Sequence, residues 1–268
     1  MIRLIASDLD GTLLNDKKQL PPDFFEVLDA LEEKGVRFTV SSGRTYNAVQ
    51  HLFPEGRHRN IDFICDNGAC VIHDGRVISI RELERPLFEE VLSECEKIDG
   101  IKVLVCAASA TYHLTDDPKF NAEIEKFYKN HVPVENLRDV NEMIYKLAIC
   151  DFQGSMTRVK PALDARFGKR LNVQVSGPLW LDVMAGGVSK GAALSELQKQ
   201  LGIAKSETMA FGDYFNDVTM LAQAEYSFCM ENGHEDVKKL CAHIAPTNND
   251  CGVTKMIREY VLGGKKEG

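Results

Sequence analysis

Two carboxylates follow the first apolar segment of the chain, in the sequence SDLDGTLL at 7–14. Alternation along a strand puts Asp8 and Asp10 on the same side, where the strand ends, and Gly11 lets the chain turn sharply. Ligands of open α/β sheets bind outside the carboxyl ends of the strands, so the pair stands where a binding site is expected. A solvated acid pair at a strand exit is the less favoured alternative, because an apolar strand precedes the pair and Gly-Thr follows it.

A second acidic segment, GDYFND at 212–217, also lies between an apolar strand and a helix. Asp213 and Asp217 add two carboxylates, and Asn216 adds an uncharged amide. Asp217 could also serve as the N-cap of the following helix. Four acids at the strand ends of one sheet would repel one another unless a cation lies among them. Their hard oxygen ligands favour Mg²⁺.

A lysine and a Ser-Gly turn complete the candidate residues. Lys190, in GGVSKG, stands in the first turn of a predicted helix, where its charge opposes the helix dipole. An acid cluster and a bound phosphate would compensate for that position. The segment SSGR at 41–44 follows a strand and offers the hydroxyl of Ser42 and the backbone N–H of Gly43 to phosphate oxygens. Taken singly, Lys190 could be a surface lysine and SSGR an ordinary turn.

The elements that must position these residues alternate between strands and helices. Near the N-terminus the pattern predicts a strand, a helix, a strand, a helix and a strand, over 2–7, 24–35, 36–40, 45–53 and 61–65. A hairpin over 69–80 follows, with Asp74-Gly75 as its turn. Towards the C-terminus the pattern predicts a helix, a strand, a helix and two short strands, over 189–202, 207–213, 217–224, 224–230 and 242–246. We expect an α/β fold in which both stretches form one Rossmann-like parallel sheet covered by helices.

The intervening residues 81–185 follow a different pattern. Helices are predicted over 86–98, over 118–130 and after Pro161, and strands over 101–107, 110–115, 143–150, 171–175 and 179–184. Adjacent strands with helices between them predict an α+β unit with an antiparallel sheet. We therefore expect a core domain made of 1–80 and 186–268, with an inserted cap domain over 81–185.

Composition narrows the class of protein. The 268 residues include 40 acidic and 32 basic side chains, a net charge of −8, and this balance argues against nucleic acid as a partner. The eight cysteines form no C-x-x-C pair, so we expect buried free thiols rather than disulfides or zinc ligands. The N-terminus lacks the pattern of a signal peptide, and no apolar run is long enough to span a bilayer. These features predict a cytoplasmic protein without a membrane partner.

The order of the motifs resembles a known family. DLDGT, SGR, SKG and GDxxND, with an insert between the second and the third, resemble the haloacid dehalogenase (HAD) superfamily of aspartyl-phosphate hydrolases. The size and position of the insert, and DNGA at 66–69, resemble the Cof-type subfamily, which carries a large α+β cap of the C2 type. The resemblance covers nearly the whole chain. It implies a phosphatase that hydrolyses phosphate monoesters of small metabolites, such as sugar phosphates, nucleotides or phosphorylated cofactors.

The resemblance also implies a role for each motif. Asp8 would be the nucleophile that forms a covalent aspartyl-phosphate, and Asp10 would protonate the leaving alcohol and then deprotonate the hydrolytic water. Mg²⁺ would be the cofactor, held by Asp8, the backbone carbonyl of Asp10, and Asp213. The phosphoryl oxygens would be bound by Ser42, Gly43 and Lys190, assisted by the N–H of Leu9 and by Asn216. Asp217 would orient Lys190 from the outer shell of the metal. Arg44 and Asn67, on loops near the site, could contact the leaving group.

Two other functions remain open at this stage. A phosphotransferase or phosphomutase would use the same aspartyl-phosphate, and a non-catalytic phospho-ligand-binding regulator would keep the scaffold without the chemistry. The regulator is less favoured, because neither the nucleophile nor a metal ligand is missing. The fourth motif departs from the family at Tyr214 and Phe215, whose bulk could crowd the site or shape it. In the insert, His113, Trp180 and Asp182 are interpreted as packing or surface residues rather than ligands.

Overall fold

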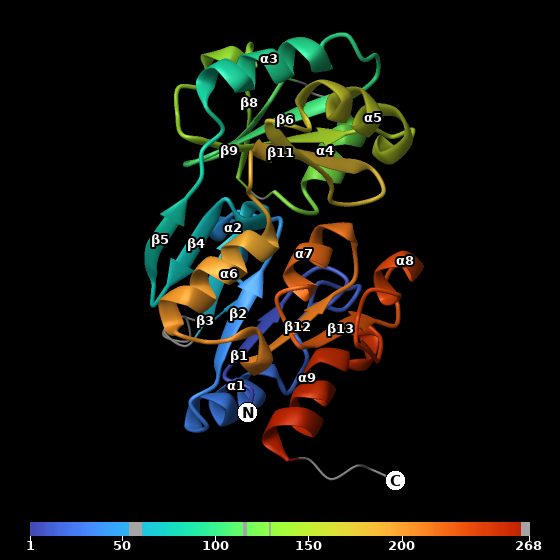
Figure 1. Cartoon of the computed structure of the whole chain (residues 1–268). Coiled ribbons are helices and arrows are strands. Elements are labelled where there is room, and N and C mark those ends of the chain that lie inside the picture. Colours follow the sequence, from blue (N-terminus) through green and yellow to red (C-terminus); the bar gives the residue numbers. More distant parts are fainter. Residues whose placement is uncertain (54–60, 115–116, 129, 264–268) are drawn as a thin grey trace.

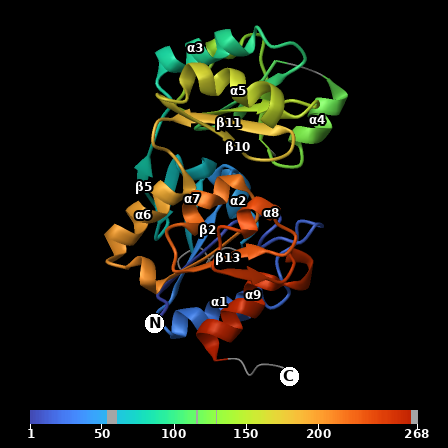
Figure 2. The ribbon, with the colours of Figure 1, turned by 45° about the vertical axis from the view of Figure 1, so that its right-hand side comes forward.

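Two separate sheets divide the chain into two lobes, which are stacked one above the other in both views (Figures 1 and 2). The structure is a computed structural model that describes residues 1–53, 61–114, 117–128 and 130–263. The core lobe holds the eight-stranded sheet, to which both ends of the chain contribute. The cap lobe holds the six-stranded sheet and is formed by one continuous stretch. The chain crosses between the lobes after Ile80 and again after Ala185.

The core sheet has the order β14-β13-β12-β1-β2-β3-β4-β5. From β14 to β3 all neighbouring strands are parallel, and β4 and β5 add an antiparallel hairpin at one edge. Its turn is Asp74-Gly75, as predicted, with positive φ angles of 48° and 71°. The strands are β1 (Leu4–Ser7), β2 (Arg37–Ser41), β3 (Ile61–Cys65), β4 (Cys70–His73), β5 (Arg76–Ile80), β12 (Thr208–Gly212), β13 (Tyr226–Met230) and β14 (His243–Ala245).

Helices cover both faces of the core sheet, because its strands are apolar on both sides. In β1, Ile5 packs in the cluster that contains α1 (Phe24–Glu33), α2 (Tyr46–Gln50) and α9 (Gly252–Ile257). Leu4 and Ala6 point the other way, towards α6 (Lys190–Leu201), α7 (Val218–Leu221) and α8 (Glu235–Lys238). The prediction of a parallel sheet with helices on its faces is confirmed.

The cap sheet has the order β10-β11-β9-β6-β7-β8. Helices α3 (Arg85–Cys95) and α5 (Ser155–Phe167) pack on the face away from the core lobe (Figure 1). Helix α4 (Pro118–Ile124) covers part of the opposite face. The rest of that face lies against the core lobe, where Met184 contacts Ala69 and Val188. The strands are β6 (Lys102–Ala107), β7 (Thr111–His113), β8 (His131–Pro133), β9 (Ile144–Cys150), β10 (Leu171–Val175) and β11 (Trp180–Ala185).

Short 3-10 turns complete the fold, and two of them carry candidate site residues: Asp66–Gly68 after β3, and Phe215–Asp217 before α7. Within the described ranges the others are Leu137–Asp139, Lys205–Glu207 and Asn248–Asp250, and a π-helical turn, Arg258–Leu262, follows α9. All eight cysteines are free thiols, as predicted, and six of them are buried. Among the described residues, no helix has both the length and the hydropathy needed to cross a bilayer.

Several predicted elements differ from the structure. The helix predicted after Pro161 begins earlier, at Ser155, so the proline lies inside α5. The lost N–H is tolerated because Val159, Leu163 and Phe167 still bury one side of the helix in the cap core. The cap sheet is not wholly antiparallel, since the unpredicted strand β8 runs parallel to β7.

The helices predicted over 118–130 and 217–224 are both shorter than expected. Helix α4 ends at Ile124, and the chain then brings Phe127 and Tyr128 against Trp180. The second segment divides into a 3-10 turn ending at Asp217 and the short helix α7. In both cases tertiary packing outweighs the helical pattern.

Candidate active site

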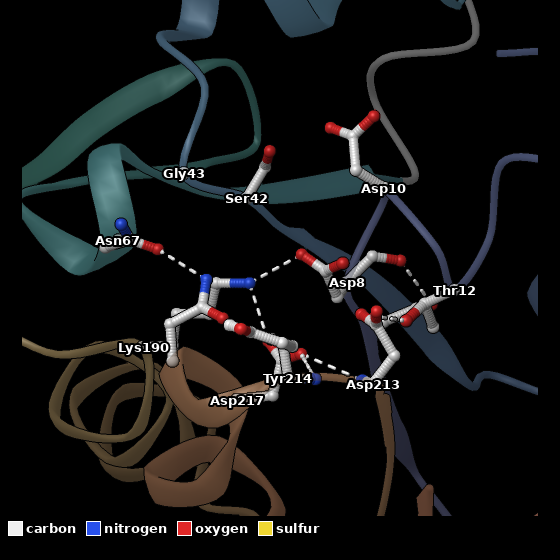
Figure 3. A network of polar contacts seen from close by, with 12 residues as sticks. Asp8, Asp10, Thr12, Ser42, Gly43, Asn67, Lys190, Asp213, Tyr214 and Asp217 are labelled. Atoms are coloured by element: carbon white, nitrogen blue, oxygen red, sulfur yellow. Dashed lines mark hydrogen bonds and ion pairs between the residues drawn. The ribbon is translucent and has the colours of Figure 1, made fainter. Parts of the chain in front are cut away.

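Candidate residues from four segments meet at the carboxyl edge of the core sheet (Figure 3). Asp8 directly follows β1, Ser42 follows β2, and Asp213 follows β12; β1 is the neighbour of both other strands. Lys190 is the first residue of α6, which Ser189 caps by accepting a hydrogen bond from the N–H of Ala192. Because parallel strands end at the same edge, segments far apart in sequence bring these side chains together.

Lys190 lies at the centre of this group and is completely buried. Its Nζ donates to Asp8 Oδ1 at 2.5 Å and to Asp217 Oδ1 at 2.6 Å. Burial alone would lower the pKa of Lys190, but the two carboxylates outweigh burial and raise it. The lysine is therefore a permanent cation between two acids, and this pairing compensates for its position at the positive end of a helix.

Both carboxylate oxygens of Asp217 accept hydrogen bonds from neighbouring residues. While Oδ1 accepts from Lys190, Oδ2 accepts from the backbone N–H groups of Asp213 at 2.9 Å and Tyr214 at 3.1 Å. The side chain thus fixes both the lysine and the loop that carries Asp213. It fits the orienting role that the family resemblance implies.

The remaining carboxylates form a group suited to a divalent cation. Asp8, Asp213 and Asp217 each offer an oxygen, and these atoms lie within 4.8 Å of one another. Burial, together with nearby negative charge, raises the pKa of Asp8 to about 7 and raises that of Asp213 well above its usual value. A cation would relieve this repulsion, and an all-oxygen donor set suits Mg²⁺. Since Asp217 is already occupied, Asp8 and Asp213 are the available side-chain ligands.

Gly11 allows the loop after β1 to approach this group. Its φ is +83°, and a β-carbon there would lie 2.5 Å from Asp213 Oδ2. The next residue, Thr12, donates from its hydroxyl to Asp213 Oδ1 at 3.1 Å. A side chain at position 11 would therefore clash with a candidate metal ligand.

Hydrogen-bond donors for an anion lie on the other side of Asp8. Among the residues that the structure describes, the backbone N–H groups of Leu9 and Gly43 donate no hydrogen bond. Ser42 Oγ accepts from the N–H of Arg44 at 3.1 Å, which leaves its own proton for another acceptor. Asn216 donates through Nδ2 to Asn67 Oδ1 at 3.1 Å, so one of its two N–H bonds is already used. Free donors beside a buried lysine can bind phosphoryl oxygens.

Asp10 is turned away from Asp8 (Figure 3). Arg44 holds both its oxygens, from Nε at 2.7 Å and from Nη2 at 2.6 Å, and Lys18 Nζ lies 2.6 Å from Oδ1. Burial would raise the pKa of Asp10, but the hydrogen bonds and charges of Arg44 and Lys18 outweigh it and lower the pKa. Arg44, expected near the leaving group, is thus committed to Asp10. No motif had pointed to Lys18.

A cavity of about 530 Å³ lies between the carboxyl edge of the core sheet and the cap lobe. Trp180 packs in a cap cluster, as interpreted, and also lines this cavity. Asp182 is buried and lines the cavity as well. His113 fits the interpretation as a packing residue, since it packs against Phe120 and His131. The cap residues that line the cavity are Glu123, Lys126, Phe127, Tyr128, Lys146, Ser176, Gly177, Pro178, Leu179, Trp180 and Asp182. Sequence patterns missed Lys146 because it stands in an otherwise apolar strand.

The bulky residues of the fourth motif do not block the site. Tyr214 forms part of the cavity wall. Phe215 packs against His234, with ring centroids 4.5 Å apart, and its carbonyl accepts a hydrogen bond from Gln174 of the cap at 3.1 Å. The Tyr214 side chain therefore shapes the cavity, and the Phe215 carbonyl takes part in the contact between the lobes.

Comparisons with known proteins agree with this arrangement. Residues 5–257 match the model of the haloacid dehalogenase-like hydrolase family. The chain is 31% identical to a 5-amino-6-(5-phospho-D-ribitylamino)uracil phosphatase of Escherichia coli, over 96% of this chain and 95% of that protein. It is 28% identical to a phosphatase of the same name from Bacillus subtilis, over 97% and 96% of the two chains. A crystal structure of a Streptococcus mutans protein superposes with a TM-score of 0.93 and 26% identity, covering 98% of this chain and all of the other.

Proposed function

The chain belongs to the haloacid dehalogenase-like hydrolases and is a phosphatase, and we propose that it hydrolyses phosphate monoesters of small metabolites through an aspartyl-phosphate on Asp8. The observation that carries this proposal is the position of Asp8. Its carboxylate is bound to the buried Lys190 and lines the same cavity as Ser42 and Gly43. A nucleophile, a cation and oxyanion donors thus surround one point at the sheet edge.

In the first step, a carboxylate oxygen of Asp8 would attack phosphorus, and the bond to the leaving alcohol would break. Lys190 fixes the orientation of Asp8 through its bond to Oδ1, and Asp217 holds Lys190. Ser42 and Gly43 would bind the phosphoryl oxygens. Mg²⁺, held by Asp8, Asp213 and the backbone carbonyl of Asp10, would neutralise negative charge on the phosphate.

Asp10 would carry the protons in both steps. Held by Arg44 and Lys18, it is a carboxylate, which is the form that takes a proton from the water that hydrolyses the intermediate. To donate a proton to the leaving alcohol, it must first gain one, which requires it to separate from these cations. Lys18 is the more exposed partner and the one more easily displaced.

The cavity suggests the chemical class of the leaving alcohol. Its volume falls within the range of small-molecule sites, about 300–1,000 Å³, and residues 81–185, which we infer to act as a cap, close it above. Phe127, Tyr128 and Trp180 provide aromatic surface suited to a planar ring. Two relatives are named as phosphatases of a phosphorylated ribitylaminouracil. A phosphorylated polyol that carries a pyrimidine ring is therefore the first substrate to test.

The test is a panel of phosphate monoesters, including polyol, sugar and nucleoside phosphates, assayed with purified protein and Mg²⁺ by phosphate release. We expect turnover that requires the metal and is lost in Asp8→Asn. Release of phosphate from no member of the panel would contradict the proposal. Excess acceptor sugar distinguishes the phosphotransferase alternative, because a transferase would yield a new phosphate ester instead of inorganic phosphate.

A further inference from the structure

A chain of buried polar side chains connects the cap sheet to the loops of the active site. Lys146 Nζ, on β9, donates to the carbonyl of Gly43 at 2.5 Å and to Asp182 Oδ2, on β11, at 3.2 Å. The same Asp182 oxygen accepts from the side-chain amide of Asn67. Asn67 in turn accepts from Asn216 at 3.1 Å. The chain therefore runs from the cap to the loops that carry Gly43 and Asn216, both of them predicted phosphate contacts.

The two cap residues of this chain are poorly explained by the stability of the cap alone. Lys146 is 1% exposed and Asp182 is 2% exposed. They are diagonal neighbours on the sheet face directed towards the core lobe, where Asp182 lies opposite Ala148 and Met184 opposite Lys146. A buried ion pair gains little over apolar residues of similar size, because desolvation offsets the attraction. The same face carries the neutral polar residues Asn172 and Gln174 opposite Met184 and Asp182, and the apolar Ala148 and Met184 beside the pair. Neutral side chains would therefore suit these two positions, so the charges call for a further explanation.

The loop that receives the cap contacts is tightly packed in a strained conformation. Asp66, Asn67 and Gly68 have positive φ angles of 50°, 53° and 104°. A β-carbon on Gly68 would lie 2.3 Å from the carbonyl oxygen of Ser189, next to Lys190, and one on Gly43 would lie 3.2 Å from Asn67 Nδ2. Strained backbone of this kind persists only where the surroundings determine it. The 66–68 loop is thus fixed between the 41–44 loop and the start of α6 on one side and the cap sheet on the other.

We propose that Lys146 and Asp182 are positioning residues that couple closure of the cap to the arrangement of the phosphate-binding loops. Their bonds to Gly43 and Asn67 form only while the cap sheet lies against the core lobe. In that state Lys146 fixes the 42–43 loop through the Gly43 carbonyl, and Asp182 fixes Asn216 through Asn67. When the cap moves away, both loops lose these contacts. The phosphate site is then complete only under a closed cap. The inference rests on the proposed function for the identity of the anion.

The experiment compares Lys146→Met, Asp182→Asn and the double variant with wild-type protein. Affinity for inorganic phosphate in the presence of Mg²⁺ is measured by calorimetry, and the radius of gyration by small-angle scattering. Each single variant leaves a buried charge without its partner, which is destabilising enough to unfold the protein by itself. The double variant removes both charges of the pair. The remaining carboxyl, Asp66, whose Oδ1 lies 4.0 Å from Lys146 Nζ, can take up a proton, because burial already raises its pKa to about 6. The double variant is therefore the one expected to keep the fold. Thermal unfolding verifies that each variant is folded.

Asp151→Asn serves as the matched control. Asp151 is also a buried cap aspartate with a cationic partner, since Arg158 Nε lies 2.8 Å from it, and its described hydrogen bonds stay within the cap lobe. We expect the double variant to bind phosphate about 10- to 100-fold more weakly, the range lost with hydrogen bonds to charged groups. Its radius of gyration should increase. The control should change phosphate affinity by less than about threefold.

A folded double variant that binds phosphate as tightly as wild type would overturn the inference, and so would wild-type protein that binds no phosphate at all. If the single variants lose stability and phosphate affinity and the double variant regains both, Lys146 and Asp182 have a purely structural role, which also contradicts the inference. The proposed function is tested separately by turnover. Wild-type protein that binds phosphate but hydrolyses no ester would refute the function and leave the phosphate-affinity comparison intact.

Discussion

Removal of divalent metal should make the stability of the protein depend on pH in a direction set by the buried acids. Asp8 has a pKa raised from 3.8 to about 7, and that of Asp213 is also raised. A carboxyl group whose pKa is raised in the folded state binds more protons there than in the unfolded chain. Stability is therefore fully present below the unfolded pKa and is lost as pH rises towards the folded value. Metal-free protein should be less stable at pH 7 than at pH 5.

The size of the effect follows from the shift. One pKa unit corresponds to about 1.36 kcal/mol, so Asp8 alone contributes on the order of 2–3 kcal/mol between pH 5 and pH 7. Asp213 adds to this loss. Asp66, whose pKa burial raises to about 6, contributes in the same direction but lies outside the metal group. Mg²⁺ should remove the part due to Asp8 and Asp213, because it favours their ionised forms, and leave the part due to Asp66.

The assay is urea unfolding at about pH 5 and pH 7, in EDTA and in saturating Mg²⁺. We expect Mg²⁺ to stabilise the protein by several kcal/mol at pH 7 and by clearly less at pH 5, where protons compete with the metal. Asp8→Asn, which cannot ionise, should weaken the dependence on both pH and metal. Equal stabilisation by Mg²⁺ at the two pH values, or metal-free stability that rises from pH 5 to pH 7, would refute the reasoning.

Three further predictions concern the reaction. Asp8→Asn should reduce turnover to background. Asp10→Asn should lower kcat about 10²–10⁴-fold on alkyl phosphates and less on aryl phosphates, because the leaving oxygen of an aryl phosphate needs less protonation. An equal loss on both substrates, measured where phosphorylation of Asp8 is rate-limiting, would exclude Asp10 as the acid. Arg44→Met removes two hydrogen bonds that lower the pKa of Asp10. The limb of the kcat/KM profile that reports Asp10 should therefore move to higher pH, and an unmoved limb would contradict the pairing. Trp180→Ala should raise KM about tenfold for a ring-bearing phosphate while leaving the affinity for inorganic phosphate unchanged, and parallel losses in both would show that Trp180 supports the fold instead.

The motif residues of the core could be predicted because one rule places them. Asp8, Ser42 and Asp213 each follow an apolar strand, and parallel strands end at one edge, so local sequence was sufficient to bring them together. Ser189 and Gly202 likewise marked the ends of α6 through local chemistry, as N-cap and left-handed C-cap. Such signals depend on a few neighbouring residues.

The cap contribution could not be predicted, because it depends on how two sheets meet. Lys146 stands in an apolar strand, and only the register of β9 against β11 shows that it shares a face with Asp182. Whether that face lies against the core or against a helix is decided by the packing of α3, α4 and α5. The pairing of Arg44 with Asp10 could not be predicted for a different reason, because the direction of a side chain on a loop leaves no pattern in the sequence. The start of α5 was predicted too late, because proline commonly stands at the start of a helix, whereas here the burial of one helix face holds Pro161 inside α5.

The division of the core sheet between the two ends of the chain also sets an order of assembly during synthesis. The cap sheet is continuous in sequence and is complete once Ala185 has left the ribosome. Strand β1 then has β2 on one side, but its other edge stays open until β12 emerges more than twenty residues later. Until then the nascent protein carries a finished cap and an unpaired apolar edge, the kind of surface that aggregates or recruits chaperones. Asp8 can gain Lys190, 182 residues further along the chain, only after the whole cap has been synthesised, so the candidate site is completed after the cap sheet.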